Sequence, residues 1–171
     1  MFHSGMNRTA RFARKGETKA SPRETKAPRR NLFSRSKQEL VELLDAEFSF
    51  NVRARAVIAG GGIARCVTCG QVGGAAELDC GHYITRAIHK TRWLRVNTGP
   101  QCAKCNRFMN GMPHVFRAYL VEKHGEARIK ALEESARDTG WRDSPEGLIA
   151  QIEELRKENR ALRKEMKCLS N

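Results

Sequence analysis

Apolar residues recur at the spacing of an α-helix in three stretches of the chain. Ser36 and Glu39 form a capping-box pattern, and the apolar residues after them predict a helix over residues 37–48. The same spacing predicts helices over residues 113–123 and from residue 127 to near Gly140. We interpret these three helices as core and support for one domain.

The C-terminal segment, residues 144–171, shows a seven-residue repeat. Ser144 and Pro145 suit the N-cap and first position of a helix. The repeat has the d and a pattern of a coiled coil, formed by Leu148, Leu155, Leu162 and Leu169 and by Ile152, Asn159 and Met166. A polar residue at an a position selects register and two-stranded pairing, so we predict a homodimer in which Glu158 meets Arg163 of a second chain. An amphipathic helix folded onto its own domain is the alternative.

Between these helices the apolar spacing changes to every second residue, which is the period of a β-strand. This alternation predicts a strand within residues 78–84. Residues 93–96 form a second candidate strand, and turn-forming residues 97–100 follow it. Residues 102–110 then predict a turn that enters a short helix. The order strand, strand, helix, with helices on both sides, predicts an α+β fold.

The net charge of the chain indicates what kind of partner it binds. The chain has 32 Lys and Arg against 19 Asp and Glu, a formal net charge of +13 and a pI of about 10.0. Such a field attracts polyanions, and nucleic acid is the expected partner. Residues 1–37 hold eleven basic residues against two glutamates, with almost no apolar periodicity. We therefore expect residues 1–35 to be a disordered basic arm that contacts phosphates, with a solubilising tail as the alternative.

A membrane surface is the competing polyanion. No apolar run approaches the ~20 residues that span a bilayer, and the N-terminal residues lack the apolar core of a signal peptide. We therefore expect a cytoplasmic protein. Six cysteines would suit disulfides in a secreted domain, but the missing export signal favours metal ligation in a reducing compartment.

Four of the cysteines form two CxxC motifs, Cys66 with Cys69 and Cys102 with Cys105. Two such turns can supply four thiolates to a tetrahedral Zn²⁺ ion at about 2.3 Å. A closed four-cysteine site is structural, because no coordination position is left for a substrate. Any chemistry should then lie between the two motifs. Two unrelated pairs of buried thiols are the alternative.

Three short motifs follow in order in this region: DCGHY at residues 79–83, LRVN at 94–97 and QCAKCN at 101–106, with a glycine a few residues beyond. This set resembles the zinc-supported HNH nucleases and, more narrowly, is similar to the lambdoid phage NinG, or Rap, recombination nuclease family. The similarity covers roughly residues 63–125. It implies a ββα-metal core and cleavage of branched DNA such as D-loops and Holliday junctions. Phage endonucleases of the endonuclease VII type share the two CxxC motifs and the following Asn.

The chemistry of phosphodiester hydrolysis gives these residues roles beside the family name. A neutral imidazole at His82 can accept a proton from water near pH 7, although a structural histidine on the hairpin is the alternative. Asn106, as the resemblance implies, offers a carbonyl oxygen to a catalytic Mg²⁺ or Mn²⁺ ion. Asn97 would fasten the loop between strand and helix by backbone hydrogen bonds, which would keep His82 aimed at the phosphate.

One departure from the HNH pattern concerns the residue before the histidine. Many HNH enzymes have an aspartate there as a metal ligand, whereas this chain has Gly81, with Asp79 three residues before His82. In a regular strand Asp79 and His82 face opposite sides, and only a bulge at Gly81 would redirect one of them. Asp79 is therefore a secondary candidate for the catalytic metal.

Five basic residues are candidate DNA contacts: Arg86, Lys90, Arg92, Arg95 and Arg107. They favour positioning of phosphates over reading of bases, and a solvated cationic face is the alternative. We expect a metal-dependent DNA endonuclease with a zinc-supported nuclease domain over residues 36–140, preceded by the basic arm and followed by the C-terminal helix. A non-catalytic, zinc-stabilised DNA-binding or adaptor module is the alternative.

Overall fold

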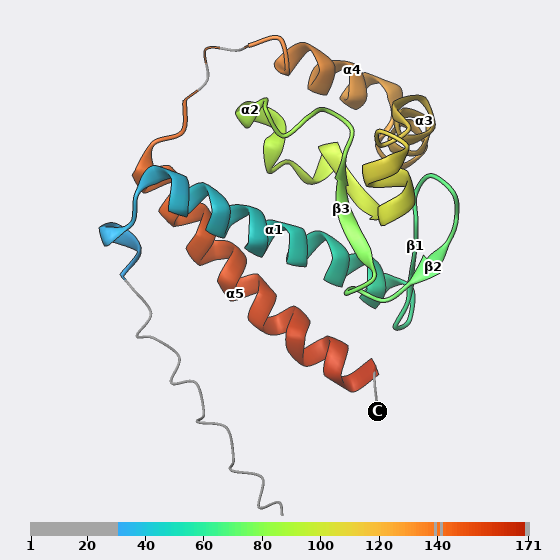
Figure 1. Cartoon of the computed structure of the whole chain (residues 1–171), viewed down its shortest axis with the longest axis horizontal. Helices are drawn as coiled ribbons and strands as arrows, with labels where there is room; N and C mark the ends of the chain where they lie inside the picture. Colours follow the sequence, from blue (N-terminus) through green and yellow to red (C-terminus); the bar gives the residue numbers. More distant parts are fainter. Residues whose placement is uncertain (1–30, 139, 141, 170–171) are drawn as a thin grey trace, which may run out of the picture.

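The computed structural model describes residues 31–138, 140 and 142–169 (Figure 1). The expected basic arm lies outside these residues except for residues 31–35, where Leu32–Ser34 form a helical turn, η1. Helices dominate the described part, and its strands form two small antiparallel sheets. The expected mixture of helices and strands is confirmed.

Helix α1 (Lys37–Ala59) packs against both the C-terminal helix and the central hairpin. Its predicted capping box is formed: the Ser36 hydroxyl accepts from the Glu39 backbone N–H at 3.2 Å, and the Glu39 carboxylate accepts from the Ser36 N–H at 2.8 Å. The helix continues beyond the predicted end at residue 48. Polar Asn51 and small Ala54 belong to its buried face, so the face continues where the apolar pattern stops.

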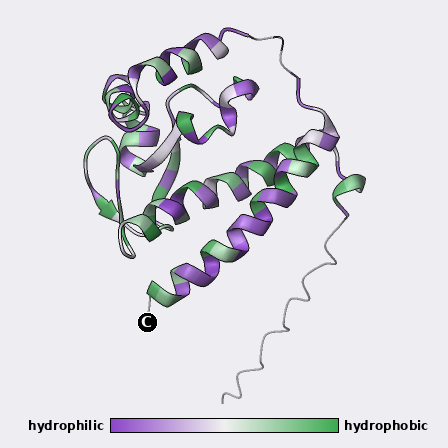
Figure 2. Cartoon of the chain, turned by 180° about the vertical axis from the view of Figure 1, so that it is seen from behind, coloured by the Kyte–Doolittle hydropathy of each residue, from purple (hydrophilic) through white to green (hydrophobic). Residues whose placement is uncertain are grey.

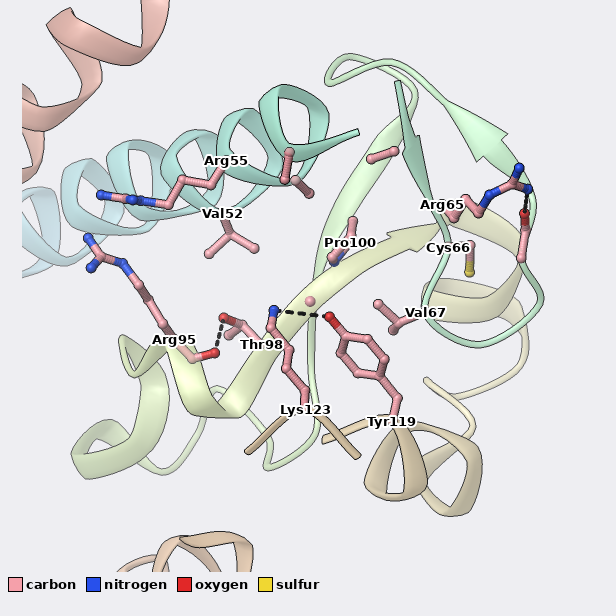
Figure 3. A pocket seen from close by; sticks show the side chains of 15 residues that line it. Val52, Arg55, Arg65, Cys66, Val67, Arg95, Thr98, Pro100, Tyr119 and Lys123 are labelled. Atoms are coloured by element: carbon pink, nitrogen blue, oxygen red, sulfur yellow. Dashed lines mark hydrogen bonds between the residues drawn. The ribbon is translucent and has the colours of Figure 1, made fainter. Parts of the chain in front are cut away.

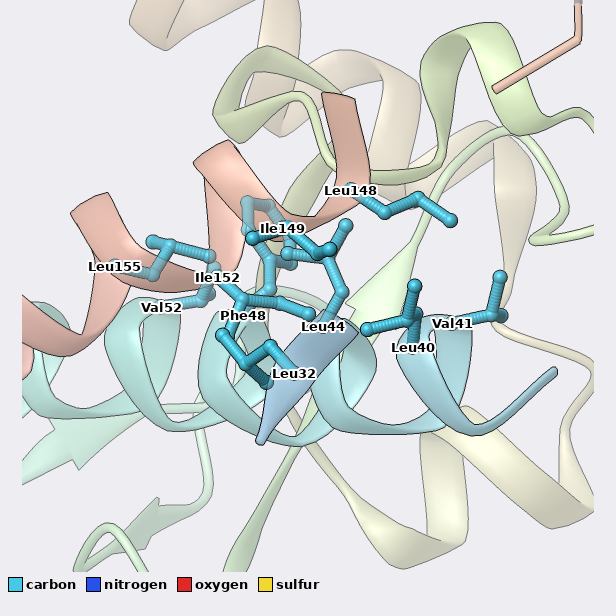
Figure 4. Close-up of a cluster of buried hydrophobic side chains, with 10 residues drawn as sticks. All are labelled: Leu32, Leu40, Val41, Leu44, Phe48, Val52, Leu148, Ile149, Ile152 and Leu155. Carbon is cyan, nitrogen blue, oxygen red and sulfur yellow. The ribbon is translucent and has the colours of Figure 1, made fainter. Parts of the chain in front are cut away.

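Helix α5 (Pro145–Leu169) lies along α1 and runs in the same direction (Figure 1). Ser144 caps it as predicted, because its hydroxyl accepts from the Gly147 backbone N–H at 3.0 Å. Figure 2 shows hydrophobic residues concentrated where the N-terminal parts of the two helices meet. They form one cluster (Figure 4) of Leu32, Leu40, Val41, Leu44, Phe48, Val52, Leu148, Ile149, Ile152 and Leu155. Burial of side chains of this kind stabilises a fold by about 1.5–3 kcal/mol each.

The a-position residue Asn159 sets the register of this helix pair. It is 2% exposed, its amide donates to the backbone and carboxylate oxygens of Glu47 at 3.0 and 2.9 Å, and its carbonyl accepts from Asn51 at 2.9 Å. A one-turn slip would leave these buried groups without partners. The expected selection of register by Asn159 therefore operates within one chain, between α5 and α1.

The predicted contacts of a two-chain zipper are replaced by contacts inside the chain. Glu158 lies 2.9 Å from Arg55 and 2.5 Å from Arg95, instead of meeting Arg163 of a second chain. The guanidinium of Arg163 lies 3.8 Å from the ring centroid of Phe50. The apolar stripe of α5 thus folds onto its own domain, which was the alternative, and homodimerisation stays a prediction.

The central hairpin pairs β3 (Leu78–His82) with β4 (Thr98–Cys102). Pairing is continuous from Leu78 opposite Cys102 to His82 opposite Thr98, so the strand reaches the histidine without a bulge. A Cβ atom on Gly81 would lie 2.1 Å from Oε1 of the buried Gln101, so only glycine fits this close approach. The first predicted strand is confirmed.

The second predicted strand, over residues 93–96, is wrong. The chain there lies between α2 (His89–Arg92) and a helical turn η2 (Arg95–Asn97), and the Trp93 indole N–H donates to Asp45 on α1 at 2.9 Å. The real strand, TGPQC, contains a glycine and a proline that are typical of turns. All five of its residues are nevertheless buried, because α1 and α3 enclose it.

The remaining elements enclose the hairpin. β1 (Ala64–Arg65) and β2 (Val72–Gly73) form a small sheet beside the C-terminal end of α1, and η3 (Lys104–Phe108) follows β4. α3 (Pro113–His124) and α4 (Glu126–Ser135) lie on the other side of the hairpin from α1 (Figure 1) and bury Phe116, Leu120 and Ile129. Both helices were predicted, although α4 ends earlier than expected. In the described part of the chain, no helix has the length and apolar character needed to cross a membrane.

Candidate functional site

The two CxxC motifs meet at one end of the hairpin. Cys66 and Cys69 belong to the turn between β1 and β2, whereas Cys102 ends β4 and Cys105 lies in η3. All four sulfur atoms lie within 4.8 Å of one another, and the Sγ atoms of Cys69 and Cys102 are 3.7 Å apart. Four thiolates at about 2.3 Å from a tetrahedral ion are separated by about 3.8 Å, so the donor set fits Zn²⁺.

The surroundings of the cluster act in opposite directions on two of its thiols. A hydrogen bond with Thr68 lowers the pKa of Cys105, but burial and the neighbouring thiols outweigh it and raise that pKa to about 12. Burial raises the pKa of Cys66, but the Thr68 hydroxyl, 3.0 Å from its sulfur, and backbone N–H groups outweigh burial and bring that pKa to about 6. The backbone N–H of Cys105 donates to the sulfur of Cys102 at 3.5 Å. With all four positions filled by sulfur, a bound ion would be structural and would tie the β1–β2 turn to η3.

His82 ends β3 with both ring nitrogens near backbone oxygens. Nε2 lies 3.0 Å from the carbonyl oxygen of Arg92 and Nδ1 lies 3.2 Å from that of Cys80. Burial lowers the pKa of His82, and the nearby charge of Arg86 lowers it further, so the ring is neutral at pH 7. A neutral ring carries one N–H, and the shorter contact assigns that proton to Nε2. Nδ1 then carries the lone pair that can accept a proton.

His82 and Asn106 line the same pocket. This open pocket has a volume of about 270 Å³, and Arg86 and Gly111 also line it. β3 supplies the imidazole and η3 supplies the amide, and the cysteine cluster ties the start of η3 in place. The imidazole of the hairpin and the amide of η3 therefore line one hollow.

Asn97 makes the backbone bonds that the sequence predicts for it. It is fully buried; its carbonyl oxygen accepts from the Ile84 N–H at 2.7 Å, and its amide donates to the carbonyl oxygens of Ile84 and Thr91, both at 3.0 Å. The loop that leaves β3 just after His82 is thereby closed onto the start of β4. Asn97 holds the loop but does not line the pocket of His82.

Asp79 lies beside Asn106, but its carboxylate forms an ion pair with Arg107. Arg107 donates to its two carboxylate oxygens at 2.6 and 2.8 Å, and the Asn106 amide donates to one of them at 3.0 Å. These bonds to Arg107 hold the pKa of Asp79 below its usual range. A cation at this carboxylate would have to displace Arg107. The bonds also orient Asn106, since its amide nitrogen faces Asp79 and its carbonyl oxygen remains for another ligand.

Comparison with known proteins places this site in a family. The family model described as "Bacteriophage Lambda NinG protein" matches residues 3–167, which is nearly the whole chain. The chain belongs to the NinG family. "Protein ninG" of Salmonella phage P22 is 31% identical to this NinG-family chain over 77 residues, which is 44% of the chain. The match spans 37% of the length of the P22 protein. No solved structure matches the chain.

Four of the five cationic residues expected to contact DNA form ion pairs within this NinG-family protein. Lys90 pairs with Asp138, Arg92 with Asp45, Arg95 with Glu158 and Arg107 with Asp79, and each acidic partner is distant in the sequence. Arg92 is the clearest departure, because its side chain is 15% exposed and bonds α1. Arg86 forms no ion pair within the described ranges and lines the pocket of His82.

Asp45 is a residue of the site that sequence reasoning missed. It accepts from the Arg92 guanidinium at 2.9 and 2.5 Å and from the Trp93 indole at 2.9 Å. Arg92 in turn offers its carbonyl oxygen to His82. Asp45 on α1 thus supports the imidazole through Arg92. In the sequence Asp45 is only an acidic residue next to the buried apolar residues of α1. Such residues are common in amphipathic helices, so the sequence does not single it out.

Proposed function

We propose that this NinG-family protein is a divalent-metal-dependent DNA endonuclease of the HNH, ββα-metal type. It hydrolyses phosphodiester bonds, and its substrates are branched recombination intermediates such as D-loops and Holliday junctions. One observation carries the proposal: a neutral, half-buried His82 shares a small pocket with Asn106 and with Arg86, a cation that forms no ion pair with any residue the structure describes. The ordered motifs that resemble the HNH nucleases support the reaction type, and the same resemblance supplies the branched substrate.

His82 acts as the general base. A water molecule between Nδ1 and the phosphate gives its proton to Nδ1 as its oxygen bonds phosphorus, and the bond from phosphorus to the leaving sugar oxygen breaks. The Nε2–H donates to the Arg92 carbonyl oxygen throughout, which fixes the ring. Arg86, at the edge of the pocket, binds the phosphate. General-base catalysis of this kind contributes about 10² to 10⁴ in rate.

The residues present fit a catalytic Mg²⁺ or Mn²⁺ ion only at Asn106. Its amide nitrogen is directed to Asp79, so its carbonyl oxygen can meet a hard cation, with water and the phosphate supplying the other oxygen ligands. When bound, such an ion would stabilise the charge that develops on the leaving oxygen. Asp79 is held by Arg107 and is a ligand only if that pair opens.

A non-catalytic, zinc-stabilised DNA-binding or adaptor module is the second candidate. The observation that favours it is the Asp79–Arg107 pair, because it occupies the carboxylate nearest to Asn106 with a cationic side chain instead of a metal ion. In this alternative the cysteine cluster shapes a cationic surface, and His82 is a structural residue that donates from Nε2 to the Arg92 carbonyl oxygen. Substitution of His82 would then leave DNA binding and every other function intact.

The deciding experiment incubates purified, zinc-loaded protein with labelled branched and linear DNA in the presence of Mg²⁺ or of EDTA. We expect cleavage of the branched DNA with Mg²⁺, and a rate about 10² to 10⁴ lower for His82→Ala. His114→Ala is the matched control, since His114 is exposed and lies outside the pocket. DNA binding without cleavage in every divalent ion tested would leave the adaptor module as the function.

A further inference from the structure

A second and larger hollow lies on the other strand of the hairpin. Its volume is about 660 Å³, and α1, the β1 segment, β4 and α3 enclose it (Figure 3). It shares no lining residue with the pocket of His82. Sites for small molecules and cofactors have volumes of about 300–1,000 Å³, so this cavity can hold a group as large as a nucleotide.

The floor of the cavity is apolar and carries one aromatic ring. Val52, Val67 and Pro100 form much of it, and the half-buried ring of Tyr119 lies beside Gly99 (Figure 3). A Cβ atom on Gly99 would lie 3.3 Å from the ring, so the backbone of β4 supports Tyr119 directly. A flat, rigidly supported surface of this kind suits a flat aromatic ligand.

The rim of the cavity is cationic. Four basic side chains line it, Arg55, Arg65, Arg95 and Lys123, and among the described residues that line it there is no acidic side chain. Arg55 and Arg95 share a single carboxylate, that of Glu158, so this pair keeps a net positive charge. Each guanidinium has five N–H donors, which leaves donors for a further anion.

Lys123 joins the rim to the floor. Its ammonium group donates to the Tyr119 hydroxyl at 3.1 Å and lies 5.4 Å from the centre of the Tyr119 ring. A positive charge is thereby fixed at the edge of the aromatic floor. The cavity therefore offers an aromatic and apolar surface with a cation directly beside it, which is the arrangement that binds a base and its phosphate together.

We propose that this cavity binds one unpaired nucleotide of a DNA strand, with its base against Tyr119 and its phosphate at Arg55, Arg95 and Lys123. The proposal rests on the proposed function in taking DNA as the ligand. Thr98 and Pro100 of the cavity lie opposite His82 and Cys80 of the catalytic pocket across the hairpin, so the two sites lie on adjacent strands. Unpaired nucleotides occur at branch points. The cavity thus recognises branched DNA by its shape, without reading its sequence.

The test measures equilibrium binding of the full-length, zinc-loaded protein in buffer without Mg²⁺ or Mn²⁺, so that no cleavage occurs. The two DNAs are a linear duplex and the same duplex with one unpaired 2-aminopurine nucleotide. We expect tighter binding of the second DNA and quenching of the probe as it stacks. Tyr119→Ala and Tyr119→Leu should each weaken binding of the second DNA by about 5- to 100-fold, and Tyr119→Phe should keep the preference.

Lys123 provides an independent readout. Lys123→Ala should reduce the slope of log affinity against log salt by about 0.9, the value for one phosphate contact. Lys157→Ala is the matched control, because Lys157 is an exposed lysine of α5 outside the cavity, and it should leave the slope unchanged. Circular dichroism establishes that each variant is folded.

The outcomes separate this proposal from the nuclease assignment. Equal affinity for the two DNAs, or a preference that survives in folded Tyr119→Leu protein, would overturn the unpaired-nucleotide site even if the protein cleaves DNA. A preference that is lost in Tyr119→Leu but accompanied by no cleavage in any divalent ion would support the site and remove only the nuclease function.

Discussion

The α1–α5 pair and the β3–β4 hairpin are neighbours that are stabilised by different forces. The helix pair buries a continuous apolar cluster, and its polar centre, Asn51 with Asn159, is satisfied inside the interface. The hairpin has five-residue strands, a thiol cluster at one end and Asn97 at the other. Apolar burial stabilises a fold without any ligand, whereas four clustered thiols gain their stabilising effect from a metal ion. The helix pair is therefore expected to be stable without a ligand, whereas the hairpin, which carries the candidate chemistry, depends on a metal ion for part of its stability.

The largest expected effect comes from removing a metal ligand. Structural zinc binds thiolate sites with about 10–16 kcal/mol, which is comparable to the whole stability of a domain. Cys102→Ser should therefore abolish zinc binding and DNA cleavage, while the α1–α5 pair keeps most of the helical circular dichroism signal. Bound zinc is measured by mass spectrometry of the native protein.

Cys168→Ser is the control for this substitution, because Cys168 is exposed on α5 and lies outside the cluster. It should bind one zinc ion per chain and melt at the wild-type temperature. If zinc-free Cys102→Ser protein cleaved DNA normally, the pocket of His82 would not depend on the cysteine cluster. The proposed contrast between the two regions would then be wrong.

A smaller effect is expected from one buried amide in each region. Asn97→Ala and Asn159→Ala each remove three side-chain hydrogen bonds from buried partners, and each should lower the free energy of unfolding by roughly 3 kcal/mol. Only Asn97→Ala should also reduce the cleavage rate at full substrate saturation, because only Asn97 holds the loop after His82. Urea unfolding and single-turnover cleavage give the two quantities.

The contrast fails if both variants lose stability equally and lose activity equally at a temperature where both are fully folded. In that case the hairpin and the helix pair would act as one unit. If both variants lose the same stability but only Asn97→Ala loses activity, the hairpin alone positions the imidazole of His82.

The smallest expected effect is a dependence of stability on pH. Burial lowers the pKa of His82 below its ordinary 6.5, so the unfolded chain binds this proton at a higher pH than the folded chain does. The free energy of unfolding should therefore fall as pH drops below 6.5, and this residue should contribute no slope above it. Urea unfolding between pH 5 and 8 measures the slope, which His82→Asn should reduce and His114→Asn should not.

The helix pair should not contribute to this effect, because α1 and α5 contain no histidine, whereas His124 on α3, whose pKa burial also lowers, should add to it. A slope of the same size in wild-type and His82→Asn protein would show that the acid sensitivity arises elsewhere in the chain. Cleavage should lose rate over the same acidic range, as the protonated imidazole can no longer accept a proton from water.

Sequence reasoning worked where a motif is short and its geometry is fixed. The spacing of the two CxxC motifs predicted the cysteine cluster, and the capping patterns at Ser36 and Ser144 predicted where two helices begin. The ordered motifs also indicated the NinG family, which the family match confirms. The helix caps and the CxxC turns each depend on residues that lie within a few positions of one another in the sequence. Tertiary packing therefore has little influence on them.

Sequence reasoning failed where packing decides. Gly99 and Pro100 are typical of turns, but enclosure between α1 and α3 makes them the middle of β4. The repeat of α5 left two partners open, a second chain and the chain's own domain, because polar Asn51 and small Ala54 interrupt the apolar pattern of the face of α1 that α5 covers. The cations of the expected DNA surface have acidic partners far away in sequence, such as Asp45 for Arg92 and Glu158 for Arg95. Such pairs become visible only once the chain is folded.

The pairing of the first long helix with the last one gives the protein a particular order of assembly. A ribosome adds about 5–20 residues per second, and the whole hairpin with α3 and α4 is made between these two helices. For several seconds, therefore, Leu40, Leu44 and Phe48 of the nascent chain lack the side chains of α5 that cover them in the folded protein. A chain released before α5 has emerged would expose a sticky surface, so complete translation is a condition for a soluble product.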